Sequence, residues 1–130
     1  MKRALLEAKK ADKIILCVGT TLREEKEESD KDTYRLNENI YDLIVELNKI
    51  NENIILVLYT GGPVELYEVN NLVKGIVYAG LGGEGVSKAL SHVLTNKVCP
   101  SGKLSESFIY FKEDSYALKG NYFYEKYDEG

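Results

Sequence analysis

Three short apolar runs divide the chain and predict three buried strands. They are residues 13–19, 53–59 and 74–79, with the sequences KIILCVG, NIILVLY and KGIVYA. Each run is rich in Ile, Leu or Val, shows no alternation with polar residues and is bounded by Gly or Thr. This pattern is typical of strands that are covered on both faces, as in parallel sheets.

Other segments carry apolar residues at helical spacing. Residues 3–11 and 84–94 each predict a helix, and a third helix is predicted from the N-cap residue Asn37 to about residue 51. Its buried stripe follows the i, i+3, i+4, i+7 pattern at Ile40, Leu43, Ile44, Leu47 and Ile50. Residues 106–110 are a candidate for a short edge strand, and residues 112–130, polar and rich in tyrosine, predict an irregular tail.

The order of these elements predicts an α/β fold with a mainly parallel sheet flanked by helices. With 130 residues, the chain has the size of a single domain, residues 1–130. Right-handed crossovers between parallel strands would bring all three strand exits to one edge of the sheet. In open α/β sheets, ligands and chemistry gather at that edge.

Composition narrows the class of protein. A formal charge of −4, with 44% hydrophobic and 29% charged residues, is ordinary for a globular domain and argues against nucleic acid as a partner. No apolar run is long enough to span a membrane, and no signal-peptide core follows Met1, so a cytoplasmic location is expected. Two cysteines and one histidine, without paired ligand spacing, predict no disulfide framework, no metal site and no cofactor.

The loop that leaves the first strand is the main candidate for chemistry. It contains six carboxylates, at Glu24, Glu25, Glu27, Glu28, Asp30 and Asp32. Such a charge run is most often a solvated connector. The functional alternative is a carboxylic acid that neighbouring negative charge keeps protonated, so that it can act as a general acid. A glycosidase needs two carboxylates, and no second isolated one stands at the other strand exits.

A glycine-rich segment offers a weaker alternative. Gly80, Gly82 and Gly85 match G-x-G-x-x-G between a strand and a helix, which is the context of a dinucleotide site. No acidic residue ends a later strand at the expected distance, and Glu84 would repel a phosphate. A tight structural turn is therefore favoured over nucleotide binding.

Several motifs together resemble one known family. They are residues 8–19, the turn 61–65 (GGPVE), residues 81–84 (LGGE), the helix residues 89–94 and the turn 100–104 (PSGKL). The chain resembles the second, C-terminal α/β sandwich domain of family 3 glycoside hydrolases, the β-glucosidase and β-xylosidase group. The resemblance implies a three-layer, flavodoxin-like sandwich that is truncated here, because residues 127–130 look like the start of a later family segment.

The resemblance also implies roles for residues of the acidic loop. The family is a retaining one, with an aspartate nucleophile on a separate N-terminal barrel and, in many members, an acid/base glutamate in this loop. Glu27 matches the acid/base position, and Asp30 and Lys31 match substrate-binding positions. Glu28 and Ser29 depart from a family glycine and aromatic residue, and Lys31 replaces an arginine, which loses a bidentate fork for carboxylates.

The sequence therefore predicts part of a retaining glycoside hydrolase that acts on β-linked glucosides or xylosides. Its expected partners are a carbohydrate substrate and the N-terminal barrel, and the chain alone is expected to be inactive because it lacks the nucleophile. The alternative is a non-catalytic α/β module for interaction or sugar binding. A truncated sheet would leave unpaired edges, which predicts a homodimer or a tendency to aggregate.

Overall fold

The computed structural model describes residues 1–21, 24–25, 33–108 and 110–111. Its elements are α1 (Lys2–Ala8), β1 (Ile14–Gly19), α2 (Glu38–Asn48), β2 (Ile54–Tyr59), the 3₁₀ turn η1 (Asn70–Leu72), β3 (Gly75–Tyr78) and α3 (Val86–Leu94). All three predicted strands and all three predicted helices are present. The helices are shorter than the apolar pattern suggested; α1, for example, ends at Ala8 and continues as a turn.

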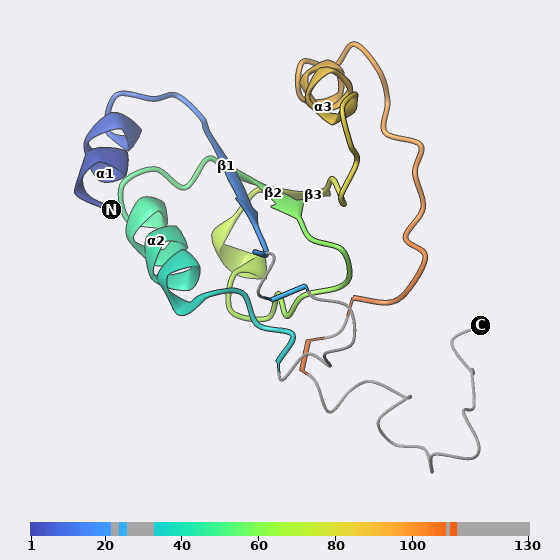
Figure 1. Cartoon of the computed structure of the whole chain (residues 1–130). Coiled ribbons are helices and arrows are strands. Elements are labelled where there is room, and N and C mark those ends of the chain that lie inside the picture. Colours follow the sequence, from blue (N-terminus) through green and yellow to red (C-terminus); the bar gives the residue numbers. More distant parts are fainter. Residues whose placement is uncertain (22–23, 26–32, 109, 112–130) are drawn as a thin grey trace.

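The three strands form one parallel sheet in the order β1-β2-β3. Ile14 pairs with Ile54 and Gly19 with Tyr59, so β1 and β2 are in register over their full lengths. All three strands therefore end at the same edge, as the sequence predicted. The loops after β1, β2 and β3 leave the sheet from that edge (Figure 1).

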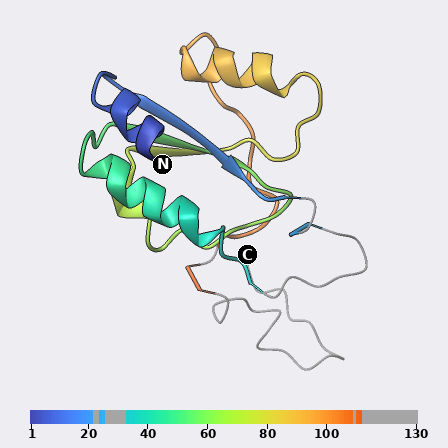
Figure 2. The ribbon, with the colours of Figure 1, turned by 60° about the vertical axis from the view of Figure 1, so that its left-hand side comes forward.

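Helices cover the two faces of the sheet, which confirms the predicted α/β sandwich. α1 and α2 lie on one face, and α3 lies on the other (Figures 1 and 2). The main core forms on the α2 side, where Leu56 and Leu58 of β2 pack with Ile44 and Tyr41 of α2. A smaller cluster of Ala8, Leu47 and Ile54 joins α1 to the same face.

The start of α2 follows the predicted capping chemistry. The Asn37 side chain accepts a hydrogen bond from the backbone N–H of Asn39 at 3.1 Å, as expected of an N-cap residue. From this start the helix turns Tyr41, Ile44 and Leu47 into the core. This end of α2 lies directly after the acidic loop, so the cap fixes where that loop ends.

Burial differs between the central and the edge strand. The prediction of two covered faces holds for β2, where Leu56, Val57 and Leu58 are all fully buried. It is wrong for β1, where Ile15 is 49% exposed and Cys17 is exposed. The reason is position: β1 is one of the two edge strands, and α3 lies over the other side of that face, against Val77 and Ala79 near β3.

The candidate edge strand at residues 106–110 is not formed by the described part of that segment. Aromatic packing accounts for its path instead. The Phe108 ring lies 5.2 Å from that of Tyr78, and the Tyr110 and Phe111 rings lie 5.9 and 4.8 Å from that of Tyr67. The predicted irregular tail, 112–130, lies outside the described residues. Within the part of the chain that is described, no helix is long and apolar enough to cross a membrane.

Candidate functional site

The site predicted from the sequence lies at the carboxyl edge of the sheet, in the loop that follows β1. Three residues of that loop were assigned roles: Glu27, Asp30 and Lys31. All three fall in the stretch 26–32, outside the described residues, so their assignments stay predictions. The structure describes the segments on either side of this stretch and shows how each is held.

The start of the loop is a closed turn. The carbonyl of Thr21 accepts hydrogen bonds from the backbone N–H groups of Glu24 and Glu25, at 2.9 and 3.0 Å. The carboxylate of Glu24 in turn accepts one from the N–H of Thr21, at 2.7 Å. The Glu24 carboxylate is therefore hydrogen-bonded within its own turn, whereas the Glu25 carboxylate bonds outside it.

Glu25 joins the loop after β1 to the loop after β2. Its two carboxylate oxygens accept from the backbone N–H of Gly61, at 2.8 and 3.0 Å. A side chain at position 61 would place its Cβ 2.5 Å from Glu25 Oε2, so the contact needs a glycine there. Sequence reasoning missed Glu25 because six similar carboxylates gave no reason to prefer it.

The two strands approach each other closely where these loops begin. A Cβ at Gly19 would overlap the carbonyl oxygen of Tyr59, which also accepts a hydrogen bond from the N–H of Thr20 at 3.2 Å. Beside it, the buried Thr60 hydroxyl donates to the Gly62 carbonyl at 2.7 Å. The Thr20 hydroxyl is buried and has no hydrogen-bond partner within the described part of the chain.

Arg35 holds the far end of the loop. Its guanidinium donates to Glu68 at 2.7 Å and to Glu38 at 3.2 Å, and it lies 4.6 Å from the centre of the Tyr41 ring. The bond from Arg35 lowers the pKa of the Glu68 carboxyl, and the same bond raises the pKa of Arg35 further above its usual range. The guanidinium therefore fixes residues just after the loop to the segment that carries Glu68.

Tyr41, in the core, makes a second set of contacts that hold the far end of the loop. Its side chain is only 3% exposed, and its hydroxyl accepts from the N–H of Leu36 and donates to the carbonyl of Glu65, both at 3.1 Å. The N–H of Glu65 donates to the carbonyl of Tyr34 at 2.9 Å. Both ends of the acidic loop are thus tied to one segment, residues 61–68, which begins with the GGPVE turn.

Replacing Tyr41 by Phe is expected to lower the free energy of unfolding by about 1–3 kcal/mol, because the buried N–H of Leu36 and the partly buried carbonyl of Glu65 would lose their partner. Burial also raises the pKa of the Tyr41 phenol. The folded state therefore holds this proton more tightly than the unfolded state, and stability should fall as pH rises beyond about 10.

Urea denaturation of the wild type and the Tyr41→Phe variant between pH 7 and 11 measures both effects. The Tyr59→Phe variant is the matched control, because Tyr59 is partly exposed and its hydroxyl makes no hydrogen bond to the residues that the structure describes. Equal stabilities for Tyr41→Phe and Tyr59→Phe would contradict the role given to the Tyr41 hydroxyl.

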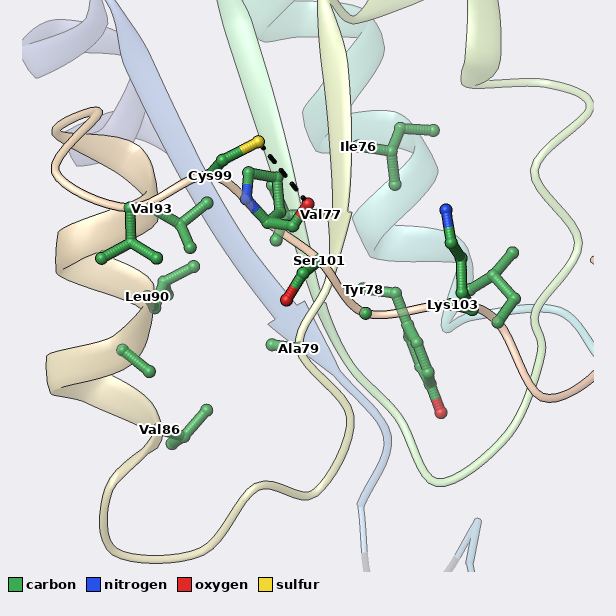
Figure 3. A pocket seen from close by; sticks show the side chains of 15 residues that line it. Ile76, Val77, Tyr78, Ala79, Val86, Leu90, Val93, Cys99, Ser101 and Lys103 are labelled. Carbon is green, nitrogen blue, oxygen red and sulfur yellow. Dashed lines mark hydrogen bonds between the residues drawn. The ribbon is translucent and has the colours of Figure 1, made fainter.

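A separate cavity of about 490 Å³ lies between β3 and α3. Val86, Leu90 and Val93 of α3 face Val77 and Ala79 across it (Figure 3). Residues 98–104 close its remaining side, and none of the described residues that line it carries a carboxylate. Its lining suits packing of α3 on the sheet better than acid/base chemistry.

The glycine-rich segment after β3 is a tight turn in the structure. Gly80 and Gly83 have φ angles of 60° and 64°, in the left-handed region that favours glycine. A Cβ at Gly82 would lie 2.8 Å from a methyl group of Val86, so the loop packs closely on the start of α3. Glu84 is exposed on the same loop. These observations explain Gly80, Gly82 and Gly83 without a nucleotide, whereas no contact or backbone angle requires a glycine at position 85.

Metal chemistry has no support in the part of the chain that is described. No group of three or more His, Cys, Asp or Glu residues there is arranged to hold an ion. Cys17 and Cys99 are both free thiols.

The fold and the anchored loop define a class: an α/β sandwich domain that presents an acidic loop at the carboxyl edge of its parallel sheet. The family model described as "Glycosyl hydrolase family 3 C-terminal domain" matches residues 1–130 of the chain. The chain is 38% identical over 106 residues to the thermostable β-glucosidase B of Acetivibrio thermocellus, covering 78% of this chain and 14% of that protein.

Two solved structures support the same family. A family 3 β-glucosidase from Bifidobacterium adolescentis superposes with a TM-score of 0.86 and 29% identity, over 91% of this chain and 18% of that one. The β-glucosidase from Kluyveromyces marxianus, in complex with glucose, superposes with a TM-score of 0.83 and 31% identity, over 90% and 14% of the two chains. The chain therefore belongs to glycosyl hydrolase family 3, as part of its C-terminal domain.

Proposed function

We propose that the chain contributes to a retaining glycoside hydrolase that acts on β-linked glucosides or xylosides. The observation that carries the proposal is the whole-chain match to the family 3 C-terminal domain. The anchored loop supports it, because both flanks of the stretch 26–32 are fastened at the edge where chemistry gathers in such sheets. The β-glucosidases that the chain resembles support the substrate class.

In this proposal Glu27 is the acid/base residue. As the acid it gives its proton to the leaving glycosidic oxygen, while an aspartate of the N-terminal barrel attacks the anomeric carbon. Glu27, now a carboxylate, then takes a proton from the water that releases the sugar. Asp30 accepts hydrogen bonds from sugar hydroxyls, and Lys31 donates to them. The Thr20 hydroxyl, which has no hydrogen-bond partner among the described residues, lies at the same edge, where a further polar group would satisfy it.

The purified chain alone is expected to hydrolyse no aryl β-glucoside or aryl β-xyloside above the buffer rate, because one of the two required carboxylates belongs to the barrel. Activity should arise when a family 3 N-terminal barrel is fused to the chain in one polypeptide, called the joined enzyme below. Release of nitrophenol from both substrates measures it.

The matched control is the joined enzyme with the nucleophilic aspartate of the barrel replaced by asparagine. Turnover by the isolated chain that Glu27→Gln abolishes would contradict the need for the barrel. An inactive joined enzyme would favour the alternative, a non-catalytic module whose exposed Ile15 and Cys17 face packs on a partner. A homodimer formed through the sheet edge stays a prediction.

A further inference from the structure

The outer edge of β1 is a surface that the candidate site does not use. Within the described residues the strand order is β1-β2-β3, and β1 pairs with β2 alone. Native sheets usually protect such an edge with charged residues, proline, a bulge or short length. The six residues of β1, IILCVG, contain no charge and no proline, and their pairing with β2 is unbroken. β3, the other edge strand, has only four residues, so β1 is the less protected edge.

The hydrogen bonds to β2 determine which backbone groups of β1 point outward. Ile14 donates its N–H to the carbonyl of Asn53 at 2.9 Å, and Thr20 donates its N–H to the carbonyl of Tyr59 at 3.2 Å. In a parallel ladder every second residue turns both of its backbone groups to the same neighbour, so the even-numbered residues of β1 bond to β2. The outer edge carries the N–H and C=O groups of the odd-numbered residues, Ile15, Cys17 and Gly19.

We propose that this edge pairs with the same edge of a second copy of the chain, antiparallel, about a two-fold axis at Cys17. Outward groups must face outward groups, so odd-numbered residues lie opposite odd-numbered residues. All three outward residues of β1 pair with one another only when Cys17 faces Cys17 of the second copy. Ile15 then faces Gly19 on either side. This β1 joint is independent of the catalytic role proposed for the acidic loop.

Charge favours a second copy in this orientation. In the same register, the exposed Lys13 just before β1 falls beside Thr21 of the second copy, just after its β1. The Glu24 carboxylate is held at Thr21, where it accepts from the backbone N–H at 2.7 Å. The β1 joint therefore brings an ammonium group near a carboxylate at both of its ends. A parallel, in-register pairing would instead place the two copies of Lys13 side by side.

The helices leave room for the β1 joint. α1 packs at the start of β1, where Ala8 and Ile14 belong to one cluster. Antiparallel pairing therefore puts the two copies of α1 at opposite ends of the joint rather than against each other. On the other face Ile15 is 49% exposed and Cys17 is exposed, so none of the described helices covers the strand there.

Association is measured by sedimentation equilibrium of the purified chain, which should show a reversible monomer–dimer equilibrium in the micromolar range. Cys17→Lys puts like charges directly opposite each other and should raise the dimer Kd at least about fivefold. Cys17→Ser, which is neutral, should stay within about threefold of the wild type, as should Cys99→Lys, the same charge change at the other exposed thiol. A chain that stays monomeric, or a dimer that Cys17→Lys leaves intact, would overturn the proposal.

Charge reversal tests the antiparallel orientation. Lys13→Glu turns attraction into repulsion at both ends of the joint and should raise the dimer Kd by roughly threefold to tenfold. Lys88→Glu makes the same change on the exposed side of α3 and should leave the Kd unchanged. Equal effects of the two substitutions would contradict the orientation. Circular dichroism and thermal unfolding show whether each variant is folded.

Cross-linking tests the register and needs no disruptive variant, so it decides the proposal even if Cys17→Lys does not fold. In a hydrogen-bonded antiparallel pair the two Cys17 Cα atoms would lie about 5.5 Å apart. A short bis-maleimide should therefore link two copies of the wild type and of Cys99→Ser, but not of Cys17→Ser. Links that persist in Cys17→Ser and vanish in Cys99→Ser, or no links at concentrations where the dimer forms, would overturn the proposal.

Discussion

Replacing Glu27 by Gln in the joined enzyme is expected to lower kcat/KM for an alkyl β-glucoside by roughly 10²–10⁴-fold, the usual contribution of a general acid. Glutamine has the same shape but carries no transferable proton, so the alkoxide would leave unprotonated. KM should change much less than kcat, because the amide still fills the position of the carboxyl. Initial rates over a range of substrate concentrations separate the two.

The control for this variant is Glu28→Gln, which removes the same charge from the adjacent residue. No catalytic role is assigned to Glu28, so its kcat/KM should stay within about threefold of the wild type, a difference of less than 1 kcal/mol. Equal losses for Glu27→Gln and Glu28→Gln would show that the net charge of the loop matters rather than one acid. The assignment of Glu27 would then be contradicted.

Replacing Ile54 by Ala is expected to lower the free energy of unfolding by about 2–5 kcal/mol, the range for an isoleucine removed from a close-packed core. Ile54 is fully buried at the start of β2, where it joins Ala8 of α1 and Leu47 of α2. The variant would leave a cavity at the contact that holds both helices on the sheet. Urea denaturation, with the slope checked for two-state behaviour, measures the loss.

Ile15→Ala makes the same chemical change on the neighbouring strand. Its side chain is 49% exposed on the other face of the sheet, so its cost should be less than about 1 kcal/mol. The difference between the two variants tests which face holds the core. A cost at Ile15 equal to that at Ile54 would mean that the β1 face is covered in solution, and the description of that face would be wrong.

Apolar runs and helical periodicity were enough to predict the fold. The runs at 13–19, 53–59 and 74–79 predicted the three strands, because short continuous runs of Ile, Leu and Val without polar alternation are typical of strands in a parallel sheet. Asn37 predicted the start of α2 to the residue, since its side chain supplies the cap that the first turn needs. The parallel order then followed from the alternation of strands and helices.

Features that depend on neighbours in space were not predictable. The open face of β1 depends on where α3 packs, and the sequence of β1 alone, IILCVG, does not reveal that. The same holds for residues 106–108, whose Phe108 packs on Tyr78 rather than extending the sheet.

The candidate site was predictable only in part, because its contacts also depend on neighbours in space. Resemblance to the family picked out Glu27, Asp30 and Lys31, whereas the contacts that flank them involve partners far along the chain. Glu25 meets Gly61, and the Tyr41 hydroxyl meets Glu65. The GGPVE turn contains both partners and was noticed only as a family motif. Its glycine has a physical reason in the structure, because any side chain at Gly61 would displace the Glu25 carboxylate.

The central claim, that Glu27 is the acid/base residue of a family 3 glycosidase, is tested most directly by the leaving group. Rates of bond cleavage are compared between the joined enzyme and its Glu27→Gln variant, with an alkyl β-glucoside and with a 2,4-dinitrophenyl β-glucoside. The dinitrophenolate needs no proton to leave, so the variant should lose roughly 10²–10⁴-fold on the alkyl substrate and much less on the dinitrophenyl one, in the step that forms the glycosyl-enzyme. Equal losses on both substrates, or none on either, would contradict the claim.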